Sequence, residues 1–249
     1  MLKEERHGLI LDELRKRNRI LLPDIATQLR VSEDTVRRDL KELHRLGKLK
    51  KVHGGAIANS FDPFSFRQEE IYDHPNKLII ANKAVSLLKR GQSVLITGGT
   101  TNLELINLLP KDLRCTFLTP SIHAAMRLTQ YKNIETIVIG GRVSTEAKVT
   151  LGGEALSLLS RVNADLCFLG TGHVDAAFGL SEFDWEVVEL KRAVIKASRK
   201  VISLTLSEKL NSIQRYKVCD IKEINALVTE LNPSDKRLDR FRNEGLEII

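Results

Sequence analysis

The segment from residue 20 to residue 57 constrains the fold of this chain more than any other. Its pattern predicts two short helices joined by a tight turn, followed by a basic hairpin. Pro23 suits the first turn of the earlier helix, and Ser32 is a natural N-cap for the later one, which we expect to end at Gly47. A preceding helix is expected over residues 3–17. Such a unit is small, so most of the chain must form a separate body.

The helix expected after Ser32 is amphipathic. Its apolar residues recur at helical spacing and are expected to face a core: Val36, Leu40, Leu43 and Leu46. Because each residue turns the helix by about 100°, its cations fall on the opposite face: Arg37, Arg38, Lys41 and Arg45. A basic face of this kind can approach phosphates and still reach base edges in the major groove. An ordinary surface helix with a basic exterior is the alternative.

The hairpin behind this helix favours nucleic-acid binding. Leu49 and Val52 are expected to pack inward, and the polar side chains point outward: Lys48, Lys50, Lys51 and His53. The Gly54-Gly55 pair permits a tight turn. Residues 1–57 hold 14 Lys and Arg against 9 Asp and Glu, whereas the remainder holds 25 against 23. A small basic module on a nearly neutral body indicates local contact with phosphates.

We therefore predict that residues 1–57 bind a double-stranded DNA operator. Arg37 and Arg38 are assigned to base recognition because Arg contacts guanine bidentately, whereas Lys50, Lys51 and His53 are assigned to phosphates. The full predicted DNA-binding set is Ser32, Thr35, Arg37, Arg38, Lys41, Arg45, Lys50, Lys51 and His53. One such unit offers a limited contact area, so a homo-oligomer, dimer or tetramer, is expected.

The rest of the chain is expected to be an α/β domain over residues 77–249, joined by a linker over residues 58–76. Short apolar segments alternate with helix-like ones; the apolar segments are 93–97, 115–119, 134–139, 165–169 and 201–206. This alternation predicts a mostly parallel sheet covered on both faces. Ligands of such folds gather at the carboxyl ends of the strands, where the 98–101 turn, Gly-Gly-Thr-Thr, could cradle a phosphate. By itself such a turn is more often structural.

Several classes of protein are disfavoured. Cys115, Cys167 and Cys219 are odd in number and lack His at ligand spacing, which argues against disulfides and a metal site. No P-loop signature, signal core or membrane-length apolar run is visible. We expect a cytoplasmic protein with no cofactor and no membrane partner.

The chain resembles a known family at this point. Residues 32–40, Ser-Glu-Asp-Thr-Val-Arg-Arg-Asp-Leu, then Gly47 and residues 53–56, His-Gly-Gly-Ala, look like the signature of the DeoR family of bacterial transcriptional regulators. Later landmarks match in order: residues 99–101, 140–141, 152, 165–170, 172–175, 179–180, 191–192 and 207–209. The resemblance implies a winged helix-turn-helix and a C-terminal sensor for phosphorylated sugars, similar in fold to ribose-5-phosphate isomerase.

The resemblance also implies an effector site. Carried over position by position, the candidates are Gly99, Thr100, Thr101, Gly140, Gly141, Gly152, Asp175 and Lys209. Lys209 can pair with a phosphate or sugar oxygen, and Asp175 can accept hydrogen bonds from sugar hydroxyls. The sequence departs from the family at Thr97, Pro120 and Thr205, where Asp, Asn and Asp are usual. These changes leave the identity of the sugar open.

Three functions follow from these observations. The leading interpretation is a transcriptional regulator, a repressor of carbohydrate-metabolism genes, controlled by a phosphorylated sugar. The first alternative is an enzyme, a sugar-phosphate isomerase, but Asp175 and Lys209 have no convincing acid–base partner for it. The second is a nucleic-acid-binding scaffold with no ligand.

Overall fold

The computed structural model describes residues 2–17, 19–52, 54–57 and 74–249, without the side chains of residues 15–19. The chain divides into two units, Met1–Tyr72 and Asp73–Ile249. The predicted linker therefore lies outside the described residues except for its last three positions. Those positions begin a helix, α4 (His74–Val85), so regular structure starts before the predicted residue 77. The limits 1–57, 58–76 and 77–249 remain our proposed division.

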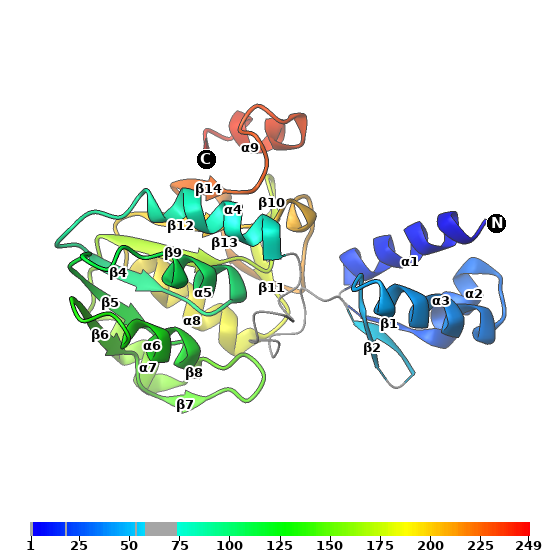
Figure 1. The fold of residues 1–249 in the computed structure, drawn as a ribbon, viewed down its shortest axis with the longest axis horizontal. Helices are drawn as coiled ribbons and strands as arrows, with labels where there is room; N and C mark the ends of the chain where they lie inside the picture. The colour runs from blue at the N-terminus through cyan, green and yellow to red at the C-terminus, as the bar shows by residue number, and fades with distance from the viewer. Residues whose placement is uncertain (1, 18, 53, 58–73) are drawn as a thin grey trace. The chain divides into compact units, whose positions relative to one another are not determined.

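The N-terminal unit contains three helices and a three-stranded antiparallel sheet (Figure 1). The helices are α1 (Lys3–Arg17), α2 (Leu22–Leu29) and α3 (Glu33–Arg45). The strands are β1 (Arg19–Leu21), β2 (Lys50–Val52) and β3 (Gly55–Ile57), in the order β1-β3-β2. Pro23 lies in the first turn of α2, and the Ser32 hydroxyl accepts the Thr35 N–H at 3.2 Å to begin α3. Helix α1 and both helix starts are as predicted.

A small apolar core holds this unit together. Its members are Ile10, Leu14, Ile20, Leu22, Ile25, Ala26, Leu29, Val36, Leu40, Leu43, Leu49 and Ala56. Two predicted members are wrong. Leu46 is 54% exposed because α3 has ended at Arg45, and Val52 is 38% exposed because β2 is an edge strand whose three residues are all exposed. Strand β1 was not predicted, since three residues are too few to show a period.

The larger unit is built on a seven-stranded parallel sheet, as predicted. Its strand order is β15-β14-β12-β9-β4-β5-β6. The strands are β4 (Ser93–Ile96), β5 (Cys115–Thr119), β6 (Ile134–Val138), β9 (Leu166–Gly170), β12 (Val201–Leu204), β14 (Ala226–Val228) and β15 (Glu247–Ile248). The central strands are buried on both sides, which is why they are continuously apolar.

Helices cover both faces of this sheet (Figure 1). On one face α4 packs against α5 (Thr100–Asn107), which packs against α6 (Ile122–Leu128). On the other, α7 (Gly153–Leu159) packs against α8 (Trp185–Lys196). A short helix, α9 (Asp239–Asn243), precedes β15. The strand–helix alternation thus gives a doubly covered sheet.

Smaller elements were not predicted. A second antiparallel sheet, in the order β10-β11-β13, contains β10 (His173–Asp175), β11 (Gly179–Glu182) and β13 (Tyr216–Cys219). A hairpin pairs β7 (Arg142–Val143) with β8 (Thr150–Leu151). Ser207–Lys209 form a 3₁₀ turn, η3. The second sheet matters for the site because β10 follows directly on the carboxyl end of β9, and β11 leads into α8.

One buried ion pair joins α1 to α3 in the N-terminal unit. Asp39 is 3% exposed, and its carboxylate accepts hydrogen bonds from Arg6 Nε at 2.5 Å and Arg6 Nη2 at 2.9 Å. His7 Nε2 lies 3.2 Å from Asp39 Oδ1. Burial is the largest single effect and acts to raise the pKa of the Asp39 carboxyl, but the hydrogen bonds and charges of Arg6 and His7 together outweigh it, so the pKa is lowered. Asp39 therefore lies on the inner face of α3, where it joins α3 to α1.

We expect Asp39→Asn to destabilise the N-terminal unit by about 3 kcal/mol, because it leaves the Arg6 guanidinium buried without its counter-charge. Hydrogen exchange of α3 amides measures the loss. Glu42→Gln is the matched control: it removes an exposed pair with Lys3 on the same two helices and should leave the protection of the α3 amides nearly unchanged. Equal protection in wild type and Asp39→Asn would contradict this role.

Candidate functional site

The predicted cations of α3 lie on one exposed face of the N-terminal unit. Arg37, Arg38, Lys41 and Arg45 are all exposed, while Val36, Leu40 and Leu43 of the same helix are buried. Arg37 is paired with Asp34 one turn earlier. A base contact by Arg37 would have to compete with that carboxylate, so Arg38 is the better placed of the two predicted base-reading residues.

Ser32 and Thr35 lie at the start of this helix. The Ser32 hydroxyl is the N-cap acceptor, and the two hydroxyl oxygens are 2.9 Å apart. Their polar atoms therefore fix the first turn of α3. A DNA backbone approaching there would meet a helix N-terminus as well as the hydroxyl groups.

The hairpin presents its lysines to the outside. Lys50 and Lys51 on β2 are exposed, whereas His53 lies outside the described residues. Gly54 has a φ of +78°, and a Cβ on Gly55 would lie 2.0 Å from the Ile20 carbonyl oxygen. Glycine is required at both positions, for conformation at the first and for space at the second. The close approach of β3 to β1 thus fixes the position of the β2–β3 hairpin relative to β1, which lies between α1 and α2 in the chain.

In the larger unit, the predicted phosphate turn lies between β4 and α5. Gly99 is the N-cap residue of α5, with a φ of +119°, and Thr100 and Thr101 are its first residues. A glycine offers no side chain to cap the helix, so no N-cap side chain accepts a hydrogen bond from the first-turn N–H groups. Amide donors and the helix dipole at such a turn favour an anion.

The neighbouring strand β9 holds this turn in place. The Gly170 N–H donates to the Thr97 hydroxyl at 2.8 Å, and the Asn102 amide donates to the Thr97 carbonyl at 2.9 Å. A Cβ on Gly170 would lie 2.5 Å from the Gly98 carbonyl oxygen. Thr97, one of the positions that depart from the family, therefore serves as an acceptor that joins β4 to β9.

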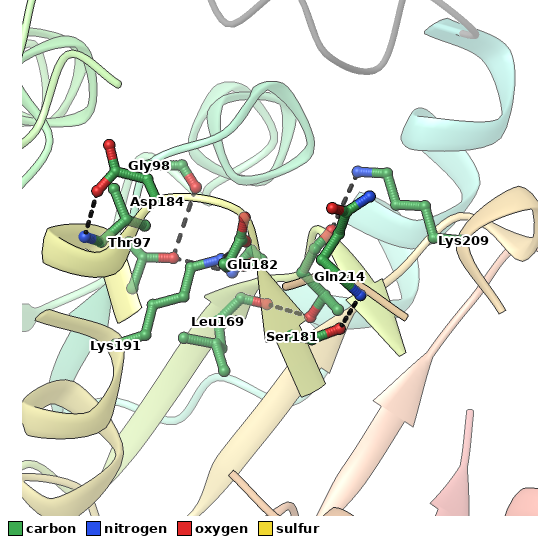
Figure 2. A network of polar contacts seen from close by, with 12 residues as sticks. Thr97, Gly98, Leu169, Ser181, Glu182, Asp184, Lys191, Lys209 and Gln214 are labelled. Atoms are coloured by element: carbon green, nitrogen blue, oxygen red, sulfur yellow. Dashed lines mark hydrogen bonds and ion pairs between the residues drawn. The ribbon is translucent and has the colours of Figure 1, made fainter. Parts of the chain in front are cut away.

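Two lysines reach the carboxyl end of β9 (Figure 2). Lys191 Nζ, from α8, donates to the Gly170 carbonyl at 2.8 Å and is paired with Glu182. Lys209 Nζ, from η3, donates to the Thr171 carbonyl at 3.0 Å. Burial lowers the pKa of the Lys209 ammonium. The structure thus brings predicted Lys209 to Thr171, the residue after Gly170, whose backbone lies against the Gly98 carbonyl.

Hydroxyl groups continue this polar cluster across the sheet. The Thr171 and Ser203 hydroxyl oxygens are 2.5 Å apart, and those of Ser203 and Thr205 are 2.8 Å apart. Thr205 is a second position that departs from the family. At the third, Pro120, the carbonyl accepts the Thr150 N–H at 2.8 Å. The changed positions are thus engaged in contacts within the fold.

The remaining predicted glycines shape the β7–β8 region. Gly141 has a φ of +134°, and a Cβ there would lie 2.6 Å from the Leu151 carbonyl oxygen. Gly140 follows β6, and Gly152, with a φ of +102°, is the N-cap of α7. This region meets the phosphate turn through Val149, whose Cγ1 would be 2.9 Å from a Cβ on Gly98.

Asp175 lies on β10 and is already engaged. Its Oδ1 accepts the N–H groups of Ala177 and Phe178 at 2.9 and 3.0 Å, and Arg240 lies 3.2 Å from Oδ2. A sugar hydroxyl would compete with these bonds, so its assignment stays a prediction. Nearby, His173 Nδ1 is 2.8 Å from the Ser212 hydroxyl, and burial lowers its pKa to about 4, which keeps the ring neutral near pH 7.

The comparisons with known proteins identify the family. The family model for the DeoR-like helix-turn-helix domain matches residues 6–61, and the model for the DeoR C-terminal sensor domain matches residues 73–231. The chain belongs to the DeoR family of transcriptional regulators. It is 30% identical to the HTH-type transcriptional regulator GolR of Listeria innocua, over 98% of this chain and 97% of that protein.

Other relatives differ in the sign of regulation. The chain is 30% identical to the HTH-type transcriptional repressor GlcR of Bacillus subtilis, over 100% of this chain and 96% of that protein. It is 26% identical to the L-fucose operon activator of Haemophilus influenzae, over 92% of this chain and 93% of that protein. The family's members are regulators, so the isomerase interpretation is set aside.

A solved ribose 5-phosphate isomerase from Methanocaldococcus jannaschii is similar at a TM-score of 0.40, with 20% identity over 54% of this chain and 53% of that one. So distant a likeness says nothing about activity.

In residues 2–17, 19–52, 54–57 and 74–249, no helix is long and apolar enough to span a membrane.

The sequence did not single out every residue of this cluster. Glu182, Ser203 and Thr171 were not identified, and Lys191 was noted only as a family landmark. Glu182 and Lys191 are nine positions apart and meet only because β11 and α8 pack together. A buried Glu and a Lys on adjacent elements give no local signature that could have revealed them.

Proposed function

We propose that this regulator is a repressor of carbohydrate-metabolism genes that binds its operator through α3 and the β2–β3 hairpin. The exposed cationic face of α3 carries the proposal, because it opposes an inner face on which Val36, Leu40 and Leu43 join the apolar core. Arg38 reads bases in the major groove, and Lys50 and Lys51 contact phosphates. The protein acts in the cytoplasm as a homo-oligomer, dimer or tetramer, so that paired units meet two half-sites.

The second part of the proposal concerns control. A phosphorylated sugar binds with its phosphate at the amide groups of Gly99, Thr100 and Thr101 and with Lys209 as a counter-charge. The support is the uncapped start of α5, the Lys209 ammonium at the carboxyl end of the neighbouring strand β9, and the family's sensor domain. The ligand changes operator affinity by binding one state of the oligomer more tightly than another.

The DNA contacts can be separated by their dependence on sequence and salt. An operator is first selected from random DNA with the wild-type protein. Arg38→Ala should lower operator affinity by about tenfold or more and relax the preference at one base pair, since a bidentate Arg contact discriminates by about 1–3 kcal/mol. Lys51→Ala should weaken all sequences alike and reduce the salt slope by about one unit.

Lys222→Ala removes an exposed lysine of the larger unit and is the control. It should change neither the operator affinity nor the salt slope. Unchanged affinity and unchanged preference in Arg38→Ala would contradict the assignment of α3 as the reading helix.

The phosphate turn can be tested with a pair of glycines. Gly99 and Gly91 both have positive φ, at +119° and +80°, and a Cβ at either position meets nothing within 4 Å. Gly99→Ala should weaken binding of orthophosphate and sugar phosphates by about tenfold or more, because it displaces the amide groups of the first turn. Gly91→Ala also places a Cβ at a positive φ, away from α5, and should bind normally.

Calorimetry on the full-length protein measures both variants. Equal affinities in Gly99→Ala and Gly91→Ala would place the phosphate elsewhere. The absence of binding by any sugar phosphate to the wild type would favour the ligand-free scaffold.

A further inference from the structure

A buried ion pair lies beside the phosphate turn. Lys191 and Glu182 are paired with only 11% and 10% of their side-chain surfaces exposed. The Lys191 ammonium also donates to the Gly170 carbonyl, and Gly170 lies against the Gly98 backbone. Figure 2 shows Lys191 and Glu182 close to Thr97 and Gly98. The two charges of this pair therefore lie near the start of α5.

The chain leaves space for the Glu182 carboxylate. A Cβ on Gly172 would lie 2.5 Å from Glu182 Oε1 and 2.8 Å from Oε2. Any other residue at position 172 would displace the carboxylate from Lys191. Glycine at this position is explained by the need to admit Glu182, and the carboxylate is thus held in one place.

Lys209 has different surroundings. Its ammonium donates to the Thr171 carbonyl, a neutral acceptor, and burial lowers its pKa. Glu208 and Glu182 act in the opposite direction through space, and Lys191 adds to the lowering. An ammonium has three donors, and one that has lost hydration is stabilised by an incoming anion. Lys209 is therefore suited to receive a phosphate, whereas Lys191 already has a carboxylate.

We propose that Glu182 limits the effector to a single phosphate group. The Glu182 carboxylate neutralises Lys191, so that only Lys209 remains to balance the charge of a bound phosphate. Glu182 also repels a second phosphate group on the same ligand. Its remaining acceptor capacity suits the hydroxyl groups of an uncharged sugar chain. This inference rests on the proposed function, because it concerns the same phosphate site.

Orthophosphate and pyrophosphate test this without knowledge of the sugar. Glu182→Gln should bind orthophosphate about tenfold more tightly than the wild type, because it removes a negative charge beside Lys191 and leaves that ammonium unneutralised near the site. Its gain for pyrophosphate should be larger still. Lys191→Met leaves Glu182 unneutralised and should bind both anions about tenfold more weakly. Affinities are measured by calorimetry on full-length protein, with circular dichroism as the check on folding.

The double variant Glu182→Gln/Lys191→Met decides the matter even where a single variant fails to fold. Both charges are gone, so the proposal expects wild-type affinity for orthophosphate. A weakened double variant would make Lys191 a direct phosphate ligand and overturn the proposal. So would a folded Glu182→Gln that binds either anion no better than the wild type. If neither the wild type nor any variant binds either anion, the proposed phosphate site itself fails.

Discussion

The close approach of β4 to β9 at their carboxyl ends determines the candidate effector site. The Gly170 N–H donates to the Thr97 hydroxyl, and Gly170 has no room for a side chain against the Gly98 carbonyl. That contact fixes the turn that begins α5. It also positions the Gly170 and Thr171 carbonyls that hold Lys191 and Lys209. Helix start and buried cations therefore share one rigid support, which a preorganised anion site requires.

The N-terminal unit separates its two tasks by helix face. The inner face of α3 supplies Val36, Leu40 and Leu43 to a core shared with α1 and α2, and the outer face supplies the cations. Asp39 belongs to the inner side, where Arg6 satisfies it. Because Asp39 faces inward and Asp34 is paired with Arg37, the exposed Arg38, Lys41 and Arg45 can present a positive surface to DNA.

Much of this architecture follows from the sequence for physical reasons. Ser32 caps α3 because its hydroxyl can accept a first-turn N–H, and residues 115–119 form β5 because a buried parallel strand is apolar on both sides. Predictions fail where an element ends. Leu46 continues the helical period beyond the last helical residue, so periodicity alone assigns it wrongly to the core.

Contacts between separate elements are not visible in the sequence. The Glu182–Lys191 pair depends on how β11 leads into α8, and the β10–β11–β13 sheet depends on a strand more than thirty residues further along the chain. The turn at Gly99 was found because glycine, hydroxyls and a helix start are adjacent in sequence. The residues around this turn, such as Glu182 and Lys191, were not found from the sequence, because only the fold brings them close to Gly99.

The most direct test of ligand-controlled DNA binding is reciprocal linkage. Operator affinity is measured with and without a saturating sugar phosphate, and the affinity for that sugar phosphate is measured with and without saturating operator. If one site controls the other, both affinities change by the same factor. A sugar phosphate that binds the protein but leaves operator affinity unchanged at saturation would contradict the account.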